Sequence, residues 1–160
     1  MARDGLTRDS TWGSRALLAN TRSEVMPLPF APDRAGQRSA RAYRVLVVED
    51  DAGLRELLVE YLEEDGFVVD AAAHGQAALA CMRRVLPDVV ILDLALPFMD
   101  GRTFAARCRQ DPWLTVVPIV LLSAQPDLSP AVEEVGARAG LAKPLDLDVL
   151  LAVIQRVTRT

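Results

Sequence analysis

The apolar positions of the chain follow two alternating patterns from residue 43 onward. Short runs rich in branched side chains predict five buried strands: RVLVV (44–48), FVVDAA (67–72), DVVILD (88–93), VVPIVLLSA (116–124) and GLA (140–142). Between and after these runs, apolar residues recur every three or four positions, which predicts five helices. The first helix has Asp51 as its N-cap and stops at Gly66. The fourth has Ser129 as its N-cap and Pro130 at its first position. The other three are expected at 75–85, 101–111 and 147–157.

Strand and helix thus alternate five times, and the strands are apolar on both faces. Such strands lie in a parallel sheet that helices cover on both sides. Right-handed crossovers then make this a doubly wound α/β domain. Sites in such sheets lie beyond the carboxyl ends of the strands, so the residues at these ends are the first candidates for chemistry.

Polar side chains stand at the carboxyl ends of four predicted strands. The first strand is followed by Glu49, Asp50 and Asp51, the third ends in Asp93, the fourth in Ser123 and the fifth in Lys143. Lys143 is the only lysine among 18 basic residues. Because these strand ends meet at one edge of a parallel sheet, we expect the side chains to lie close together.

The carboxylates at this edge require a cation. Two carboxylates about 4 Å apart repel by about 4 kcal/mol at an effective dielectric near 20, and further carboxylates add to the penalty. Helix capping accounts for Asp51, but it does not explain Glu49 and Asp50 opposite Asp93. A few oxygen ligands in a partly solvated site favour Mg²⁺, so the residues predict a magnesium site.

The same set of groups suits phosphoryl transfer. An aspartate can act as a nucleophile and become an acyl phosphate. The transferred group spreads its charge over three oxygens, which the cation, Lys143 and Ser123 can each bind. No histidine or spare base is placed for general hydrolysis, so aspartyl phosphorylation is the predicted reaction.

Composition separates the chain into two parts. Residues 1–41 hold seven arginines and four acidic residues, a balance of +3, whereas residues 42–160 hold 11 basic and 18 acidic residues, a balance of −7. The first part lacks periodicity and is rich in Pro, Gly and Ser, so we predict a disordered basic extension at 1–41 and a folded domain at 42–160. Its dispersed arginines fit a solvating role better than contact with nucleic acid or an acidic partner, and translation from Met26 would remove part of the extension.

The rest of the composition indicates a cytoplasmic protein. No apolar run approaches the ~18–20 residues that a membrane span needs, and none resembles the core of a signal peptide. Cys81 and Cys108 form no zinc-binding spacing with the single histidine, His74. Two isolated thiols suggest a reducing compartment, and we expect both to be half-buried and unreactive.

Four motifs in order resemble the response-regulator receiver domain of two-component signalling, a CheY-like domain, over about residues 43–158. They are VLVVEDD (45–51), DLALPFMDG (93–101), IVLLSA (119–124) and AKP (142–144). The resemblance implies a (βα)5 fold with the flavodoxin-like strand order 2-1-3-4-5. It also implies a stand-alone receiver, because the last predicted helix ends at the chain terminus.

By this resemblance, Asp93 accepts phosphate from a phosphohistidine of a sensor histidine kinase or phosphotransfer protein. The implied Mg²⁺ ligands are Glu49 (through water), Asp50, Asp93 and the backbone carbonyl of Ala95. Ser123 and Lys143 bind the phosphoryl oxygens, and phosphorylation switches the binding of an unknown output protein. Catalysis is limited to the domain's own phosphorylation and dephosphorylation, and the −7 balance argues against direct DNA binding.

Two features depart from the family. An aromatic residue commonly lies three positions before the lysine, where this chain has Gly140. The segment between Ser123 and Lys143 is also slightly short, which predicts a short fourth helix. Pro144 is expected to form the corner that orients Lys143, and a cis bond is one way to form it. The residues for phosphorylation therefore match the family, whereas the aromatic residue that usually relays the signal to the output is absent at position 140.

Three alternative functions follow from these residues. Gly140 favours a non-switching, receiver-like scaffold that binds partners regardless of phosphate. A haloacid-dehalogenase-type phosphatase would need a second aspartate two positions after the nucleophile, where this chain has Ala95. A flavin-binding relative would need a phosphate loop after the first strand, which the sequence lacks.

Phe98 and Met99 are expected to pack the loop beside Asp93.

Overall fold

The computed structural model describes residues 41–159. Apart from Arg41, the predicted extension at 1–41 lies outside the described residues, so the boundary near residue 41 stays a prediction. Ten elements alternate along the described chain: β1 (Arg44–Val48), α2 (Ala52–Glu64), β2 (Val68–Ala72), α3 (Gly75–Arg84), β3 (Val89–Asp93), α4 (Gly101–Gln110), β4 (Ile119–Ser123), α5 (Ser129–Val135), β5 (Ala139–Ala142) and α6 (Leu147–Thr158).

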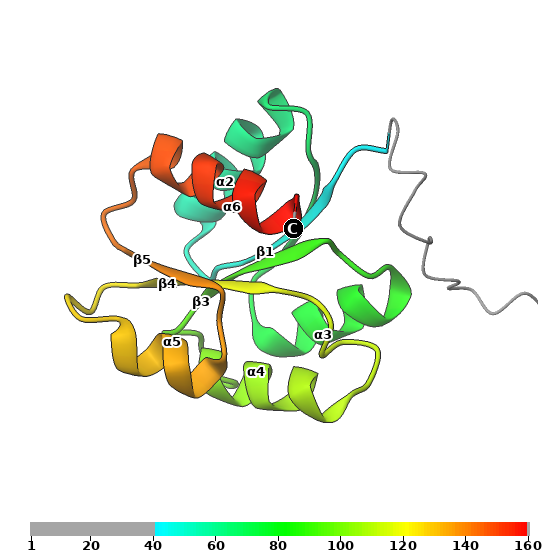
Figure 1. Cartoon of the computed structure of the whole chain (residues 1–160), viewed down its shortest axis with the longest axis vertical. Helices are drawn as coiled ribbons and strands as arrows, with labels where there is room; N and C mark the ends of the chain where they lie inside the picture. Colours follow the sequence, from blue (N-terminus) through cyan, green and yellow to red (C-terminus); the bar gives the residue numbers. More distant parts are fainter. Residues whose placement is uncertain (1–40, 160) are drawn as a thin grey trace, which may run out of the picture. The chain divides into compact units, whose positions relative to one another are not determined.

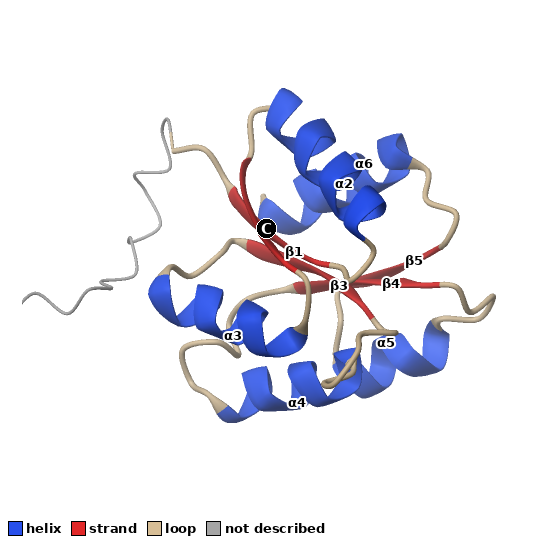
Figure 2. Cartoon of the chain, turned by 180° about the vertical axis from the view of Figure 1, so that it is seen from behind, coloured by secondary structure: helices blue, strands red, loops and turns tan. Residues whose placement is uncertain are grey.

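The five strands form one parallel sheet in the order β2-β1-β3-β4-β5. This confirms the predicted doubly wound fold and its strand order. Helices α2 and α6 cover one face of the sheet, and α3, α4 and α5 cover the other (Figures 1 and 2). The order reverses between β1 and β3, so the ends of these two central strands meet at the topological switch point.

The sheet separates two apolar clusters, and β3 contributes to both. Val89 and Ile91 pack with residues of α2 and α6, whereas Val90 and Leu92 pack with residues of α3, α4 and α5. This alternation is the two-residue period of a strand whose two faces are both buried. Since every residue of β3 is buried, Asp93 at its end is held by a rigid central strand.

Several predicted boundaries were wrong by a single residue, and two errors, at the starts of β4 and α5, change the role of a residue. β4 begins at Ile119 rather than Val116, because residues 111–117 form hydrogen-bonded turns and leave the Val116 side chain exposed. α5 begins at Ser129 rather than after it. Ser129 is therefore not the N-cap, and its own N–H is bound by the Asp127 carboxylate at 3.0 Å.

The short helix α5 is held by two arginines of α4. Arg102 pairs with Glu134 at 2.7 Å, and Arg109 donates to the backbone carbonyls of Glu134 and Val135 at 2.9 and 2.6 Å. Arg109 thus binds carbonyls that a helix C-terminus leaves without partners.

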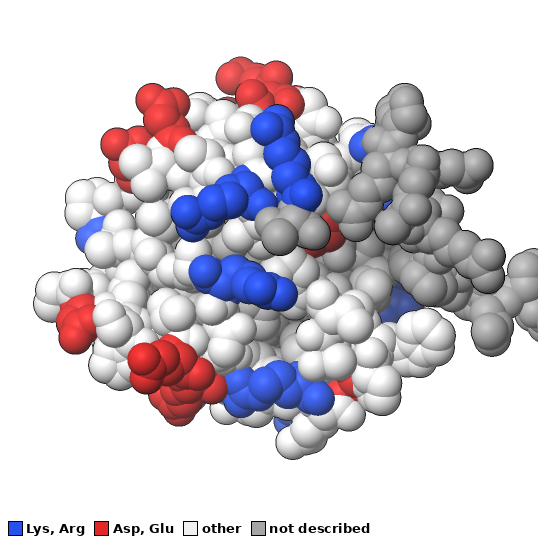
Figure 3. All heavy atoms as spheres, in the orientation of Figure 1, with Lys and Arg blue, Asp and Glu red and all other residues white. Residues whose placement is uncertain are grey.

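Basic side chains run through the middle of the face shown in Figure 3, and acidic side chains lie nearer its margin.

Burial predicts different reactivity for the two free thiols. Cys108 is buried, not half-buried as predicted, and burial, with a smaller effect of Asp111, raises the pKa of its thiol to about 12. Cys81 is partly buried, as predicted, so we now expect it, unlike Cys108, to react. We expect a thiol reagent at pH 8 to label folded protein at Cys81 alone and unfolded protein at both cysteines, as mapped by peptide mass spectrometry. The variant Cys81→Ser should stay unlabelled while folded, and labelling of Cys108 in folded protein would contradict the prediction.

Candidate functional site

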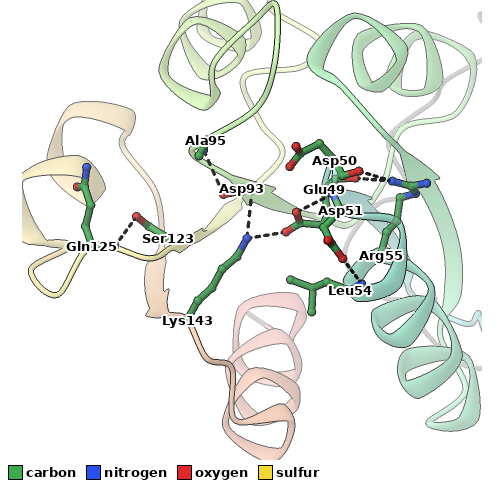
Figure 4. A network of polar contacts seen from close by, with 10 residues as sticks. All are labelled: Glu49, Asp50, Asp51, Leu54, Arg55, Asp93, Ala95, Ser123, Gln125 and Lys143. Carbon is green, nitrogen blue, oxygen red and sulfur yellow. Dashed lines mark hydrogen bonds and ion pairs between the residues drawn. The ribbon is translucent and has the colours of Figure 1, made fainter.

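Three carboxylates meet where β1 and β3 end. Oxygen atoms of Glu49, Asp50 and Asp93 all lie within 4.8 Å of one another. Figure 4 shows these three side chains together with Lys143. Glu49 is 1% exposed and Asp93 is 3% exposed, whereas Asp50 is exposed. The structure therefore brings together the three acidic side chains that the sequence placed at this edge. Like charges this close repel strongly, so the cluster suits a cation.

Lys143 supplies one positive charge to the cluster. Its Nζ atom lies 2.8 Å from Glu49 Oε2 and 3.2 Å from Asp93 Oδ2. Burial by itself lowers the pKa of Lys143, but the hydrogen bond to Glu49 and the charge of Asp93 outweigh burial and raise the pKa above its usual value. The lysine is therefore a fixed ammonium between two buried carboxylates.

The buried position of the Glu49 carboxyl makes its charged form less favourable. Burial raises its pKa, and the negative charge of Asp93 raises it further. Hydrogen bonds from Lys143 and from the Asp51 N–H, the latter at 3.1 Å, act in the opposite direction without cancelling the rise. Glu49 is thus ionised less readily than an exposed glutamate, and a further cation nearby would favour its charged form.

Ser123 and Ala95 lie beside the acidic cluster. The buried Ser123 Oγ accepts a hydrogen bond from the Gln125 N–H at 3.1 Å, which leaves its hydroxyl proton free to donate elsewhere. The Ala95 N–H donates to Asp93 Oδ1 at 3.1 Å. Lys143 N–H donates to Ser123 O at 2.8 Å, and this bond keeps the ends of β4 and β5 together.

Arg55 is a site residue that the sequence analysis missed. Its guanidinium donates to the backbone carbonyls of Glu49 at 2.8 Å and of Asp50 at 3.2 Å. It therefore fixes the turn that carries these two acids and brings a second positive charge near them. An arginine in the first turn of the helix that Asp51 caps was a signal for this contact.

Gly101 allows the loop after Asp93 to return to β3. A Cβ atom at this position would lie 2.8 Å from Asp93 O and 2.9 Å from Leu94 Cα, both backbone atoms that cannot move aside easily. The Gly101 N–H also donates to Leu94 O at 3.1 Å. The start of α4 is thus packed directly on the backbone of the candidate nucleophile.

Phe98 and Met99 in this loop behave differently. Met99 is buried, as predicted, and its thioether packs against Gly75 at the start of α3. Phe98 was expected to pack the loop as well, and this prediction was wrong. Its side chain is 101% exposed and its φ is 65°. The Met99 N–H bonds to Pro97 O at 2.7 Å, so the chain turns sharply at Phe98 and points its side chain outward.

The segment that carries Lys143 holds two further features. The Lys143–Pro144 bond is cis, which is one of the predicted ways to form this corner. At Gly140, a Cβ atom would lie 2.8 Å from Val132 Cγ2 and 3.3 Å from Leu128 Cβ. Side chains of α5 and of the residue before it therefore fill the space beside position 140.

The sequence matches the family described as the response regulator receiver domain over residues 45–155. The chain belongs to this family. Its curated relatives include the transcriptional regulatory protein CseB of Streptomyces coelicolor, which is 40% identical over 117 residues, 72% of this chain and 49% of CseB. The chain spans about half the length of such relatives. Response regulators act in two-component systems, where receiver domains accept phosphoryl groups and pair with histidine kinases and output domains.

Solved receiver structures agree with the fold and the acidic site. A putative response regulator from Chloroflexus aurantiacus is 36% identical, with a TM-score of 0.71 over 75% of this chain and 100% of that one. The receiver domain of the Pseudomonas aeruginosa sensor histidine kinase PA1611 is 26% identical, with a TM-score of 0.67 over 75% of this chain and 100% of that one, and was solved with a magnesium ion in its active site cleft. Among the described residues of our receiver, no helix is long and apolar enough to cross a membrane.

Proposed function

We propose that this receiver accepts a phosphoryl group on Asp93 from the phosphohistidine of a histidine kinase or phosphotransfer protein. One observation carries the proposal. The Asp93 carboxylate is buried at the end of the central strand, with the Lys143 ammonium at 3.2 Å and two other carboxylates close enough to share a cation. A nucleophile, a fixed positive charge and an acidic metal cluster are the parts that aspartyl phosphorylation requires.

The transfer forms one bond to phosphorus and breaks another. An Asp93 oxygen attacks phosphorus, the P–N bond of the phosphohistidine breaks, and its electron pair stays on the imidazole nitrogen, which takes up a proton. The Lys143 ammonium, held at this edge by Glu49, is placed to bind one phosphoryl oxygen. The Ser123 hydroxyl can donate to another, because Gln125 uses only its acceptor capacity. These preorganised donors stabilise the charge that develops on the transferred group.

The donor set fits Mg²⁺. Carboxylates of Asp50, Asp93 and Glu49, the last through water, would hold the ion together with the backbone carbonyl of Ala95. These are hard oxygen ligands, and the exposure of Asp50 leaves room for the waters that Mg²⁺ retains. When bound, the ion supplies positive charge to a phosphoryl oxygen and offsets the repulsion among the three acids.

The wider role follows from this chemistry. We place the protein in the cytoplasm, where phosphorylation of Asp93 alters the binding of an output protein. Residues 42–160 carry a balance of −7, so the receiver itself is not expected to contact DNA directly.

Incubation with Mg²⁺ and acetyl phosphate tests the function. The receiver should gain about 80 Da, one phosphoryl group, because acetate leaves when the Asp93 oxygen attacks phosphorus. The adduct should disappear under mild alkali or hydroxylamine, as an acyl phosphate does, and should not form with EDTA. Folded protein that gains no such adduct would exclude the proposed function.

One observation favours a second candidate function. The space beside Gly140 is filled by Val132 and Leu128, so the usual aromatic relay has no place here. A scaffold that binds its partner regardless of phosphate would not need that relay. The intact acidic site opposes this alternative, which predicts the same partner affinity with and without the acyl phosphate.

A further inference from the structure

Phe98 occupies a strained backbone conformation. Its φ of 65° lies in the left-handed region, which bulky residues rarely adopt, and it is the central residue of the tight turn closed by Met99 N–H and Pro97 O. Among the described residues, Phe98 is the only one other than glycine with positive φ. Strain of this kind persists only where the surrounding structure enforces it, and it often marks a functional position.

The strained turn leaves an aromatic ring fully exposed. The turn directs Met99 into the core against Gly75 and leaves Phe98 101% exposed. The next most exposed large apolar side chains of the described residues, Val116 and Trp113, are 68% and 58% exposed. The Phe98 ring is therefore surrounded by water, which is unfavourable for an apolar side chain of the isolated domain.

The position of Phe98 indicates what would contact it. The residue lies in the loop that follows Asp93, and the neighbouring Pro97 is also exposed. Exposed acids Asp50 and Asp100 lie at the same edge of the sheet, at the end of β1 and the start of α4. A protein that delivers a phosphoryl group to the buried Asp93 must approach this edge and contact the loop.

We propose that Phe98 anchors the protein phosphodonor. The donor would carry an apolar recess beside its phosphohistidine, bordered by basic side chains that face the acidic edge. Aromatic side chains that enter such recesses often dominate the energy of an interface. The inference rests on the proposed function, because it concerns delivery of phosphate to Asp93. A donor as small as acetyl phosphate reaches Asp93 without this contact.

Two phosphodonors distinguish an effect of Phe98 on donor docking from an effect on the transfer step. The probes are acetyl phosphate and the autophosphorylated histidine kinase cores of the source organism, each purified and mixed with the receiver. For the kinase that phosphorylates the wild type fastest, we expect Phe98→Ala to lower kcat/KM of transfer at least tenfold, with partial rescue by Phe98→Leu. The rate with acetyl phosphate should stay within about twofold. Phe98→Gly should not lower Tm, because glycine adopts this φ without strain.

Trp113→Ala is the matched control, since it removes another exposed aromatic side chain from a loop at the opposite edge of the sheet. It should leave both rates within about twofold of wild type. The inference is overturned if Phe98→Ala accepts phosphate from the kinase as fast as wild type, if both donors slow equally, or if no kinase phosphorylates the wild type. It is also overturned if the variant changes only self-association, measured by sedimentation. Failure of acetyl phosphate to label the wild type would instead exclude the proposed function itself.

Discussion

Asp93→Asn protein should stay folded and acquire no phosphoryl group. The amide that replaces the carboxylate is not a nucleophile that can form an acyl phosphate, so the mass increase of about 80 Da should disappear with acetyl phosphate and with a kinase. Folding should survive because Lys143 keeps its 2.8 Å contact with Glu49. Removal of the Asp93 charge also relieves its repulsion of the buried Glu49, so Tm should be unchanged or slightly higher. Intact mass and thermal unfolding measure both outcomes.

The control for Asp93→Asn is Glu56→Gln. It makes the same change from carboxylate to amide at an exposed position on α2, and it should be phosphorylated like wild type. If Asp93→Asn gained the same hydroxylamine-sensitive adduct at the same rate, another carboxylate would be the acceptor. Peptide mapping of the adduct would then identify it.

Lys143→Ala should reduce phosphorylation by about two orders of magnitude. The lysine is a preorganised donor at the point where charge develops, and loss of one such donor typically costs 10²–10³ in rate, about 3–4 kcal/mol. Lys143→Arg keeps the charge, but its planar guanidinium does not fit between Glu49 and Asp93 as a compact ammonium does. We expect its rate to fall at least tenfold, as measured by the initial rate of adduct formation with acetyl phosphate.

The free energy of unfolding of Lys143→Ala tests the same contact independently of the phosphorylation rate. Lys143→Ala leaves Glu49 buried without its ammonium partner, which should cost about 2–3 kcal/mol near neutral pH, less than a fully buried pair because Lys143 is 23% exposed. The pKa of Glu49 is already raised, and loss of the lysine raises it further. The loss of stability in Lys143→Ala is therefore largest above the pKa that Glu49 has in the variant. The loss shrinks as the pH falls through that pKa, since a protonated Glu49 needs no counter-charge. Chemical denaturation at several pH values tests this, and an equal deficit at all pH values would contradict it.

The positions of the site residues could be predicted because strand ends in a parallel sheet converge. Runs such as DVVILD and IVLLS could be located by their apolar residues, and the side chain after each run then had to lie at the shared edge. Glu49, Asp93 and Lys143 meet in the structure for this reason. The roles of Ser123 and of the Ala95 carbonyl rest on the proposed function.

Other features could not be predicted because they depend on competition among neighbours. Phe98 and Met99 are adjacent and both apolar, and only the space beside Gly75 decides that Met99 turns inward. Apolar residues extend from Val116 to Leu122, and only the turns at residues 111–117 place the first of them outside β4. Local patterns do not contain such information, because it arises from packing between distant segments.

The charges at the carboxyl edge also link cation binding to folding. Three carboxylates and one ammonium leave a net charge of −2, and two of the carboxylates are almost completely buried. A divalent cation balances this charge, but only in the folded chain, where β1 and β3 bring the acids together. Such a cation stabilises the native state by an amount that grows with the logarithm of its concentration above the dissociation constant. The metal concentration of the cell would then set the stability of the resting domain as well as its reactivity.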